Sequence, residues 1–92
     1  MQGRTFEVTP AIARSISQIY LYHGRYEDAS HLLQPIVNKL GVTDESVPLI
    51  RNYLVALMKQ DQLDEALYDE FIAAYPEEEV MIHGVINLLD EI

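Results

Sequence analysis

The sequence predicts an all-α protein in which antiparallel helix hairpins stack into a short solenoid of about five helices. Three observations lead to this prediction. Apolar residues recur every three or four positions along most of the 92 residues, prolines and glycines divide the chain into segments of helix length, and one ten-residue stretch occurs twice. No segment shows the pattern of a strand. We expect residues 1–9 to be an N-terminal extension and residues 10–92 to form a single helical domain.

The first helix is expected over residues 10–23. Thr9 can cap it, and Pro10 suits its first position, where a missing N–H costs no hydrogen bond. One stripe of helically spaced residues is expected to face a neighbouring helix; it comprises Ile12, Ile16, Ile19, Tyr20 and His23. Gly24 follows and can adopt the left-handed conformation that ends a helix.

The second helix is expected to begin at residue 26 or 27 and to extend to Leu40. Pro35 lies inside it and removes one backbone hydrogen bond, but the apolar period continues beyond this proline. We therefore expect a bend rather than an end. Gly41 and the polar residues up to Ser46 predict the main loop.

The third helix, over residues 46–60, is expected to lie at the centre of the fold. Six consecutive apolar residues, Tyr53 to Met58, cannot share one stripe of a helix with about 3.6 residues per turn, so neighbours must cover it on more than one side. Leu54 and Leu57 are the strongest candidates for core positions.

The fourth helix is expected over residues 63–75. Leu67, Phe71 and Ala74 share its predicted inner face. The pair Tyr75-Pro76 ends it, because a residue before proline disfavours helical backbone angles.

The fifth helix begins after Pro76, where three consecutive glutamates suit the positive end of the helix dipole. The rest of it is strongly apolar, whereas the last helix of a solenoid normally has a polar outer face. This helix therefore either closes the groove of its own stack or offers a second interface to another chain. The candidate residues for that interface are Met81, Val85, Leu88 and Leu89.

The duplicated stretch is the most specific signal in the chain. Residues 20–29 and 57–66 align without a gap at an offset of 37 positions, with Asp61 in place of Gly24. In both copies an apolar helix ends in a polar turn, and an acidic pair precedes a small Ala. This order resembles the tetratricopeptide repeat, a helical hairpin with a period of about 34 residues, and the resemblance covers residues 10–76. By size, charge and architecture the chain is similar to the needle-subunit chaperones of bacterial type III secretion systems.

The resemblance implies a concave groove lined by the first helix of each pair, with Ser17 and Leu54 packed between helices. The implied groove residues are Arg14, Gln18, Leu21, Tyr22, Arg51, Asn52, Val55 and Met58. The apolar members suit a partner helix, and they equally suit the core. Arg14 and Arg51 occupy equivalent positions and resemble part of a carboxylate clamp, although His83 alone is available from the last helix; the other interpretation pairs both arginines with local carboxylates.

The same resemblance implies a function. The chain would be a cytoplasmic chaperone whose groove covers an amphipathic helix of a needle-type secreted subunit, and a small helical co-chaperone would stabilise it as a heterodimer, as part of a virulence system. The alternative is an adaptor or scaffold that binds a peptide terminus through Arg14 and Arg51. An enzyme is not expected, because the sequence contains no nucleophile motif and no metal-ligand spacing.

The composition excludes several partners. Fifteen acidic against six basic residues give a formal charge of −9, which repels nucleic acid and anionic lipid surfaces. The absence of cysteine excludes disulfides and thiolate chemistry. No apolar run is long enough to span a membrane, and the first nine residues do not resemble a secretory signal, so we expect a cytoplasmic protein without membrane insertion, cofactor or metal.

Overall fold

The computed structural model describes residues 8–92, and within this range it contains five α-helices and no strand. The elements are α1 (Pro10–Tyr22), α2 (Tyr26–Leu40), the 3-10 turn η1 (Asp44–Ser46), α3 (Val47–Lys59), α4 (Glu65–Ala74) and α5 (Glu78–Asp90). The predicted all-α class is confirmed, and the predicted helix boundaries differ from the observed ones by at most two residues. Most of the predicted N-terminal extension, residues 1–7, lies outside the described residues.

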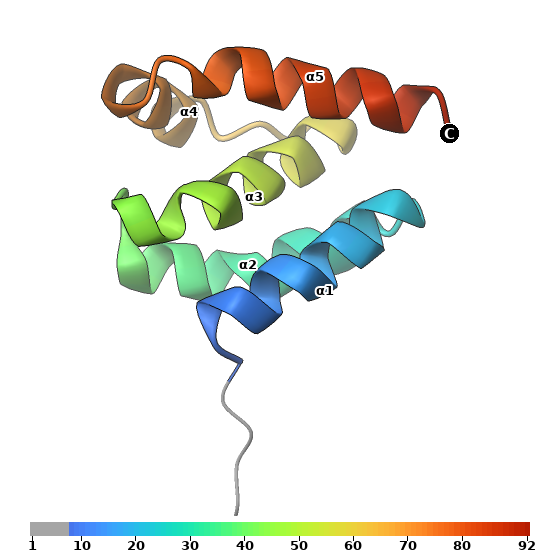
Figure 1. Ribbon diagram of the computed structural model, residues 1–92, viewed down its shortest axis with the longest axis horizontal. Coiled ribbons are helices and arrows are strands. Elements are labelled where there is room, and N and C mark those ends of the chain that lie inside the picture. The colour runs from blue at the N-terminus through green and yellow to red at the C-terminus, as the bar shows by residue number, and fades with distance from the viewer. Residues whose placement is uncertain (1–7) are drawn as a thin grey trace, which may run out of the picture.

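The helices form a stack in which α1, α3 and α5 lie one above another. Figure 1 shows these three helices running in the same direction, so that their C-terminal ends gather at one end of the molecule. Helix α2 lies behind α1, and α4 is seen nearly end-on at the opposite end. One broad face of the molecule therefore consists of α1, α3 and α5 alone.

Helix α3 is the centre of the core, as predicted from its apolar run. Helices α1, α2 and α5 all pack against it. Leu54 is completely buried and Leu57 is 8% exposed. The buried residues of α3 are Leu49, Ile50, Asn52, Tyr53, Leu54, Val55, Ala56 and Leu57.

The predicted inner stripe of α1 is wrong for three of its five residues: Tyr20 packs against the core and Ile16 is half-buried, but Ile12, Ile19 and His23 are exposed. Ile12 and Ile19 are 48% and 57% exposed, whereas Ala13 and Ser17 are completely buried. The small side chains allow α1 to approach its neighbours closely, which side chains the size of isoleucine would prevent. The α1 ridge, as we call it, consists of the exposed residues Ile12 and Ile19 and the half-buried Ile16, which lie on one outer side of the helix.

The turns after α1 and α3 have the same backbone form. Gly24 has φ +74° and Asp61, its partner in the duplicated stretch, has φ +58°. Both lie in the left-handed region that glycine adopts readily and that other residues adopt at a cost. The duplication therefore extends to the backbone conformation, even where the glycine is replaced.

Helix α4 contacts the core mainly through Phe71, which is completely buried, while Leu67 is half-buried. Ala74 is exposed, so its predicted inward position is wrong. The side chain of Asp64 caps the helix by accepting a hydrogen bond from the backbone N–H of Leu67 at 3.1 Å. At its other end the ring of Tyr75 packs on Phe71, with centroids 5.8 Å apart.

Pro35 lies inside α2 without ending it, as predicted, since the helix continues to Leu40. The side chain of Thr9 caps α1 by accepting a hydrogen bond from the backbone N–H of Ile12 at 3.2 Å. Both local predictions from proline and cap chemistry are confirmed.

Candidate functional site

The three helices of the broad face enclose a cleft, which is the candidate functional site. It has a volume of about 60 Å³. Its lining residues are Gln18, Leu21 and Tyr22 from α1, Arg51 and Asn52 from α3, and Val85 and Leu89 from α5. Because a single water molecule occupies about 30 Å³ of liquid, the cleft itself admits part of a side chain and not a helix.

A second hollow adjoins the cleft where α1 and α5 end. This end pocket has a volume of about 280 Å³. It shares Leu21, Tyr22 and Leu89 with the cleft, and its remaining lining residues are His23, Gly24, Tyr26 and Ile92. Its size and its aromatic and aliphatic walls suit one large side chain of a partner.

Exposed apolar side chains surround both hollows. Tyr22 is 51% exposed, Leu88 is 47% exposed and Ile92 is 74% exposed. On α5, Met81, Val85, Leu88 and Ile92 follow one another at three- and four-residue spacing, and we call them the α5 stripe. Met81 is 45% exposed. The stripe shares Val85 with the cleft and Ile92 with the end pocket, so the two hollows and the stripe adjoin one another on α1 and α5.

Arg51 forms an internal ion pair that fixes α5 on α3. Its Nε donates to Glu78 Oε1 at 2.6 Å and its Nη2 donates to Glu78 Oε2 at 2.9 Å. The two side chains are 20% and 6% exposed. This two-point geometry is the strongest form of a carboxylate contact. Of the interpretation that pairs both arginines with carboxylates, the part for Arg51 is therefore correct and its guanidinium is already occupied, whereas Arg14 forms no ion pair within residues 8–92.

A polar contact lies beneath the cleft. The Asn52 side-chain amide donates to the Ser17 hydroxyl at 2.9 Å, and that hydroxyl donates to the carbonyl of Arg14 at 3.0 Å. Asn52 is 4% exposed, so its amide depends on this partner. Asn52 therefore joins α3 to α1 and is not available as a clamp for a ligand.

Lys59 provides a second link between α3 and α5. Its ammonium donates to Asp90 and lies 5.5 Å from the ring centre of Tyr26. The hydrogen bond to Asp90 raises the pKa of Lys59 above its usual value, so the amine is charged at neutral pH. This places a cation between the ends of α2, α3 and α5.

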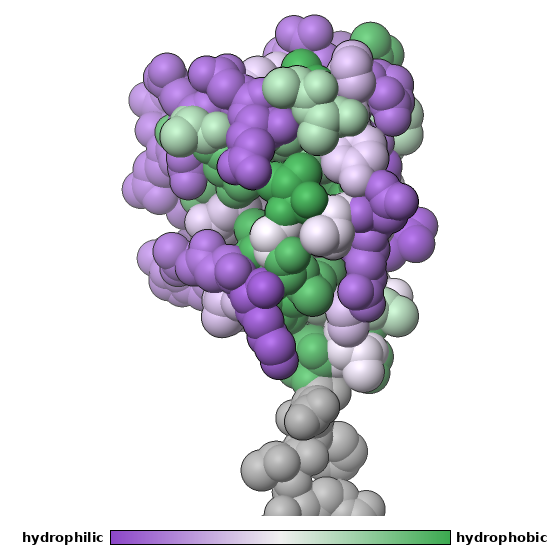
Figure 2. Space-filling model, turned by 90° about the vertical axis from the view of Figure 1, so that its left-hand side faces the viewer, coloured by the Kyte–Doolittle hydropathy of each residue, from purple (hydrophilic) through white to green (hydrophobic). Residues whose placement is uncertain are grey.

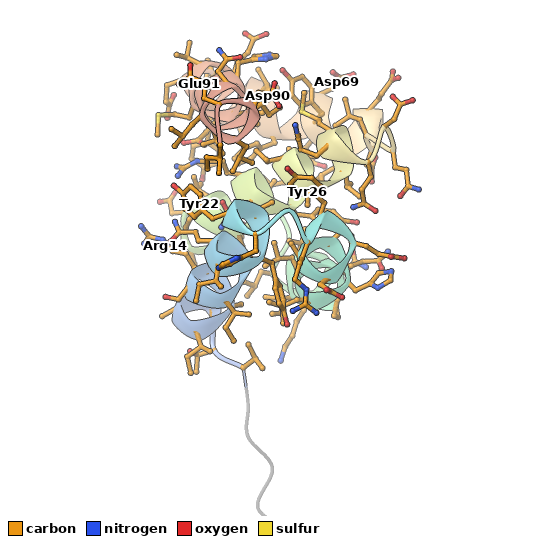
Figure 3. The ribbon with its side chains drawn as sticks, turned by 90° about the vertical axis from the view of Figure 1, so that its right-hand side faces the viewer. Arg14, Tyr22, Tyr26, Asp69, Asp90 and Glu91 are labelled. Atoms are coloured by element: carbon orange, nitrogen blue, oxygen red, sulfur yellow. The ribbon has the colours of Figure 1, made fainter. Side chains whose placement is uncertain are left out.

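Charge is distributed very unevenly along the chain. Residues 60–92 contain ten acidic side chains and no lysine or arginine, whereas residues 1–59 contain five acidic and six basic ones. Figure 3 shows Asp90 and Glu91 at the end of α5, above Tyr22 and Tyr26, with Asp69 of α4 toward the other side of the molecule. The apolar surface thus borders the strongly acidic part of the protein.

The structure brings together most of the residues predicted as sites. Five of the eight predicted groove residues line the cleft, and two of the four residues predicted for a second interface, Val85 and Leu89, line the same cleft. The last helix therefore forms one wall of the groove, and the two predicted sites are one surface.

Three predicted groove residues do not line this surface. Val55 is completely buried, so its assignment to an open groove is wrong; α5 packs along α3 and leaves no opening there. Met58 is half-buried and lies outside the cleft lining. Arg14 is exposed, but it does not line the cleft either.

Three residues at these sites were not predicted as site residues: Tyr26, Glu78 and Ile92. The glutamate was assigned only to a favourable helix start, and its contact with Arg51 spans 27 positions, which no local pattern reveals. The apolar character of Ile92, beyond the end of α5, was the available signal for the end pocket.

A separate apolar hollow lies at the other end of the molecule, between the beginning of α1 and the end of α2. A hollow of about 440 Å³ is lined there by Val8, Thr9, Pro10, Pro35, Ile36, Lys39 and Leu40. Figure 2 shows a hydrophobic band running up this end of the molecule between hydrophilic flanks. With the α1 ridge, it gives the protein more than one uncovered apolar surface.

Within residues 8–92 no group of three or more histidine or acidic side chains is arranged to hold a metal ion. None of the helices in that range is both long and apolar enough to cross a bilayer.

Comparison with known proteins gave no assignment: no family model, no curated protein and no solved structure matches the chain significantly.

Proposed function

We propose that the protein is a binding module that shelters an amphipathic helix of another polypeptide on the surface formed by α1 and α5. The observation that supports this most directly is the exposure of large apolar side chains beside the two hollows, where Tyr22, Met81, Leu88 and Ile92 are each at least 45% exposed. Such a patch on a small chain is typical of an interaction surface. Its tyrosine and methionine adapt to a partner helix at modest entropic cost.

The mode of binding follows from the size of the hollows. Both are too small for a helix, so the partner helix lies along the α5 stripe and inserts one side chain into the end pocket. An anchor of this kind, surrounded by weaker apolar contacts, is how most helix-binding surfaces obtain their affinity.

The finer form of the proposal is an export chaperone of the type III secretion class, with a needle-type subunit as its client and a small helical co-chaperone as a second partner. The α1 ridge supports two partners rather than one, because Ile12 and Ile19 are exposed and lie outside the cleft lining. Each partner would add stability to a chain of 92 residues through mass action.

The adaptor alternative, in which Arg14 and Arg51 grip a peptide terminus, is not favoured. Releasing Arg51 for a ligand would leave the carboxylate of Glu78, which is 5% exposed, without its partner.

The test uses designed amphipathic peptides of about five helical turns, each with one tryptophan on its apolar face. The protein has six tyrosines but no tryptophan, so fluorescence excited beyond the absorption band of tyrosine reports the peptide alone. We expect a blue shift and saturable binding for at least one peptide, and a loss of affinity of about tenfold or more in Leu88→Asp and Tyr22→Ser.

Ile19→Asp is the matched control, because Ile19 is an equally exposed aliphatic residue on a 13-residue helix but belongs to the α1 ridge. It should leave peptide affinity unchanged. The proposed function is wrong if no peptide binds, or if Ile19→Asp and Leu88→Asp weaken binding equally.

A further inference from the structure

We infer that the partner is an amphipathic helix whose apolar centre is flanked at both ends by lysine or arginine, and that it lies along the α5 stripe. This inference rests on the proposed function and specifies the chemistry of its partner. It depends on two observations, the exposure of the α5 stripe and the position of the charges around it.

The α5 stripe is an uncovered apolar face on the side of α5 that borders the cleft. Met81 is 45% exposed, Leu88 is 47% exposed and Ile92 is 74% exposed. Val85 lines the cleft and Ile92 lines the end pocket, so a helix that lies along the stripe would also meet both hollows.

The charges around the stripe define the ends of that helix. Glu77 and Glu79 lie at the beginning of α5, and Asp90 and Glu91 lie at its end, while the stripe between them carries no charge. Glu77, Glu79 and Glu91 make no ion pair within residues 8–92. Because α5 is about 20 Å long, basic residues about four turns apart on the partner would meet both acidic ends.

A second copy of the chain does not fit this surface. Two α5 helices packed against each other would bring acidic ends together in the parallel and in the antiparallel orientation, because each end carries carboxylates and α5 has no lysine or arginine. Like charges placed opposite each other oppose association. The charge pattern thus selects a basic partner and disfavours self-association through α5.

The experiment compares three forms of the same peptide, with identical apolar faces and with Lys, Gln or Glu at both ends. We expect the Lys-flanked form to bind about tenfold more tightly than the Gln-flanked form, and the Glu-flanked form to bind least. The difference between the Lys and Gln forms should shrink as salt is added, because exposed charges are screened.

Variants that replace carboxylates by amides test whether the preference for the Lys-flanked peptide arises at the ends of α5. Glu77→Gln combined with Glu91→Gln should remove most of the preference for Lys while leaving binding of the Gln-flanked peptide unchanged. Asp69→Asn combined with Glu70→Gln removes the same charge from α4 and should leave more of the preference in place than the Glu77 and Glu91 double variant does.

The outcomes separate this inference from the proposed function. Equal affinity of the three peptides, with all three sensitive to Leu88→Asp, would overturn the charge inference and leave the helix-binding function standing. Absence of binding by every peptide would overturn both. Binding of the Lys peptide that is insensitive to Leu88→Asp would be general electrostatic attraction and would also overturn the inference, as would a homodimer that Leu88→Asp dissociates.

Discussion

The first and last levels of the stack are held to the central helix by different forces. The first level, α1 and α2, packs on α3 through small and apolar side chains such as Ala13, Ala29 and Leu33, all completely buried. The last level, α4 and α5, buries Phe71 and Ile82 but also depends on ion pairs with cations of α3. The two ends of one small fold are therefore stabilised in different ways.

Because of this difference, a basic partner should stabilise the last level more than the first. Residues 60–92 repel one another through ten carboxylates, and α3 supplies the two cations, Arg51 and Lys59, that offset part of this repulsion. A basic partner would offset more of it. The first level has nearly balanced charge and gains nothing comparable from such a partner.

The largest effect should come from removing the aromatic anchor of the last level. Phe71→Ala is expected to destabilise the protein by about 3–5 kcal/mol, because it leaves a cavity where a completely buried ring was. Hydrogen exchange should show that amides of α4 and α5 lose more protection than those of α1 and α2. Leu33→Ala in α2 is the matched core truncation. Equal loss of protection in all helices after Phe71→Ala would show that the two levels unfold as one unit.

Breaking the ion pair should have the next largest effect. Arg51→Met is expected to cost about 3 kcal/mol, since it leaves the nearly buried carboxylate of Glu78 without compensation. The double variant Arg51→Met with Glu78→Met should recover most of this loss, because two apolar side chains replace the pair. Urea unfolding of the three proteins measures both quantities. A double variant as unstable as Arg51→Met would mean that the pair itself, rather than the unpaired charge, determines stability.

A smaller loss is expected from the polar contact beneath the cleft. Ser17→Ala removes the hydroxyl that accepts from Asn52 and leaves a buried amide N–H without a partner, at a cost of about 1–2 kcal/mol. Ser15→Ala, at an exposed position of the same helix, should have almost no effect. Thermal unfolding of both variants would distinguish a specific hydrogen bond from a general effect of serine in this helix.

Local rules were sufficient for the helices and their ends. Thr9, Gly24 and Pro35 act as their chemistry predicts, and the apolar run of α3 correctly identified the central helix. These features depend on residues within one or two turns of each other, so the sequence alone contains the necessary information.

Tertiary packing decided what local rules could not. The helical period of α1 is compatible with two buried faces, one that carries isoleucines and one that carries alanine and serine. Hydrophobicity alone predicted that the isoleucine face would be buried, and this was wrong. Val55 was assigned to the groove because nothing local indicates that α5 lies across α3. The pairing of Arg51 with Glu78, which closes this region, is fixed only when the stack is assembled.

The smallest effects should come from substitutions in the two equivalent turns, and Asp61→Gly should be stabilising. Asp61 has φ +58° and Gly24 has φ +74°, but only glycine adopts this conformation without a steric penalty from a Cβ atom. Asp61→Gly relieves that penalty and one negative charge, against a larger loss of backbone entropy on folding, so a net gain of about 0.5 kcal/mol is expected. Gly24→Ala should cost about 1 kcal/mol, because the Cβ atom of alanine is strained in the left-handed region and no neighbour within 4 Å offers a compensating contact. Thermal unfolding at high salt, where charge effects are screened, should retain the gain from Asp61→Gly if it comes from the backbone; a gain that disappears would assign it to charge repulsion in the acidic last level.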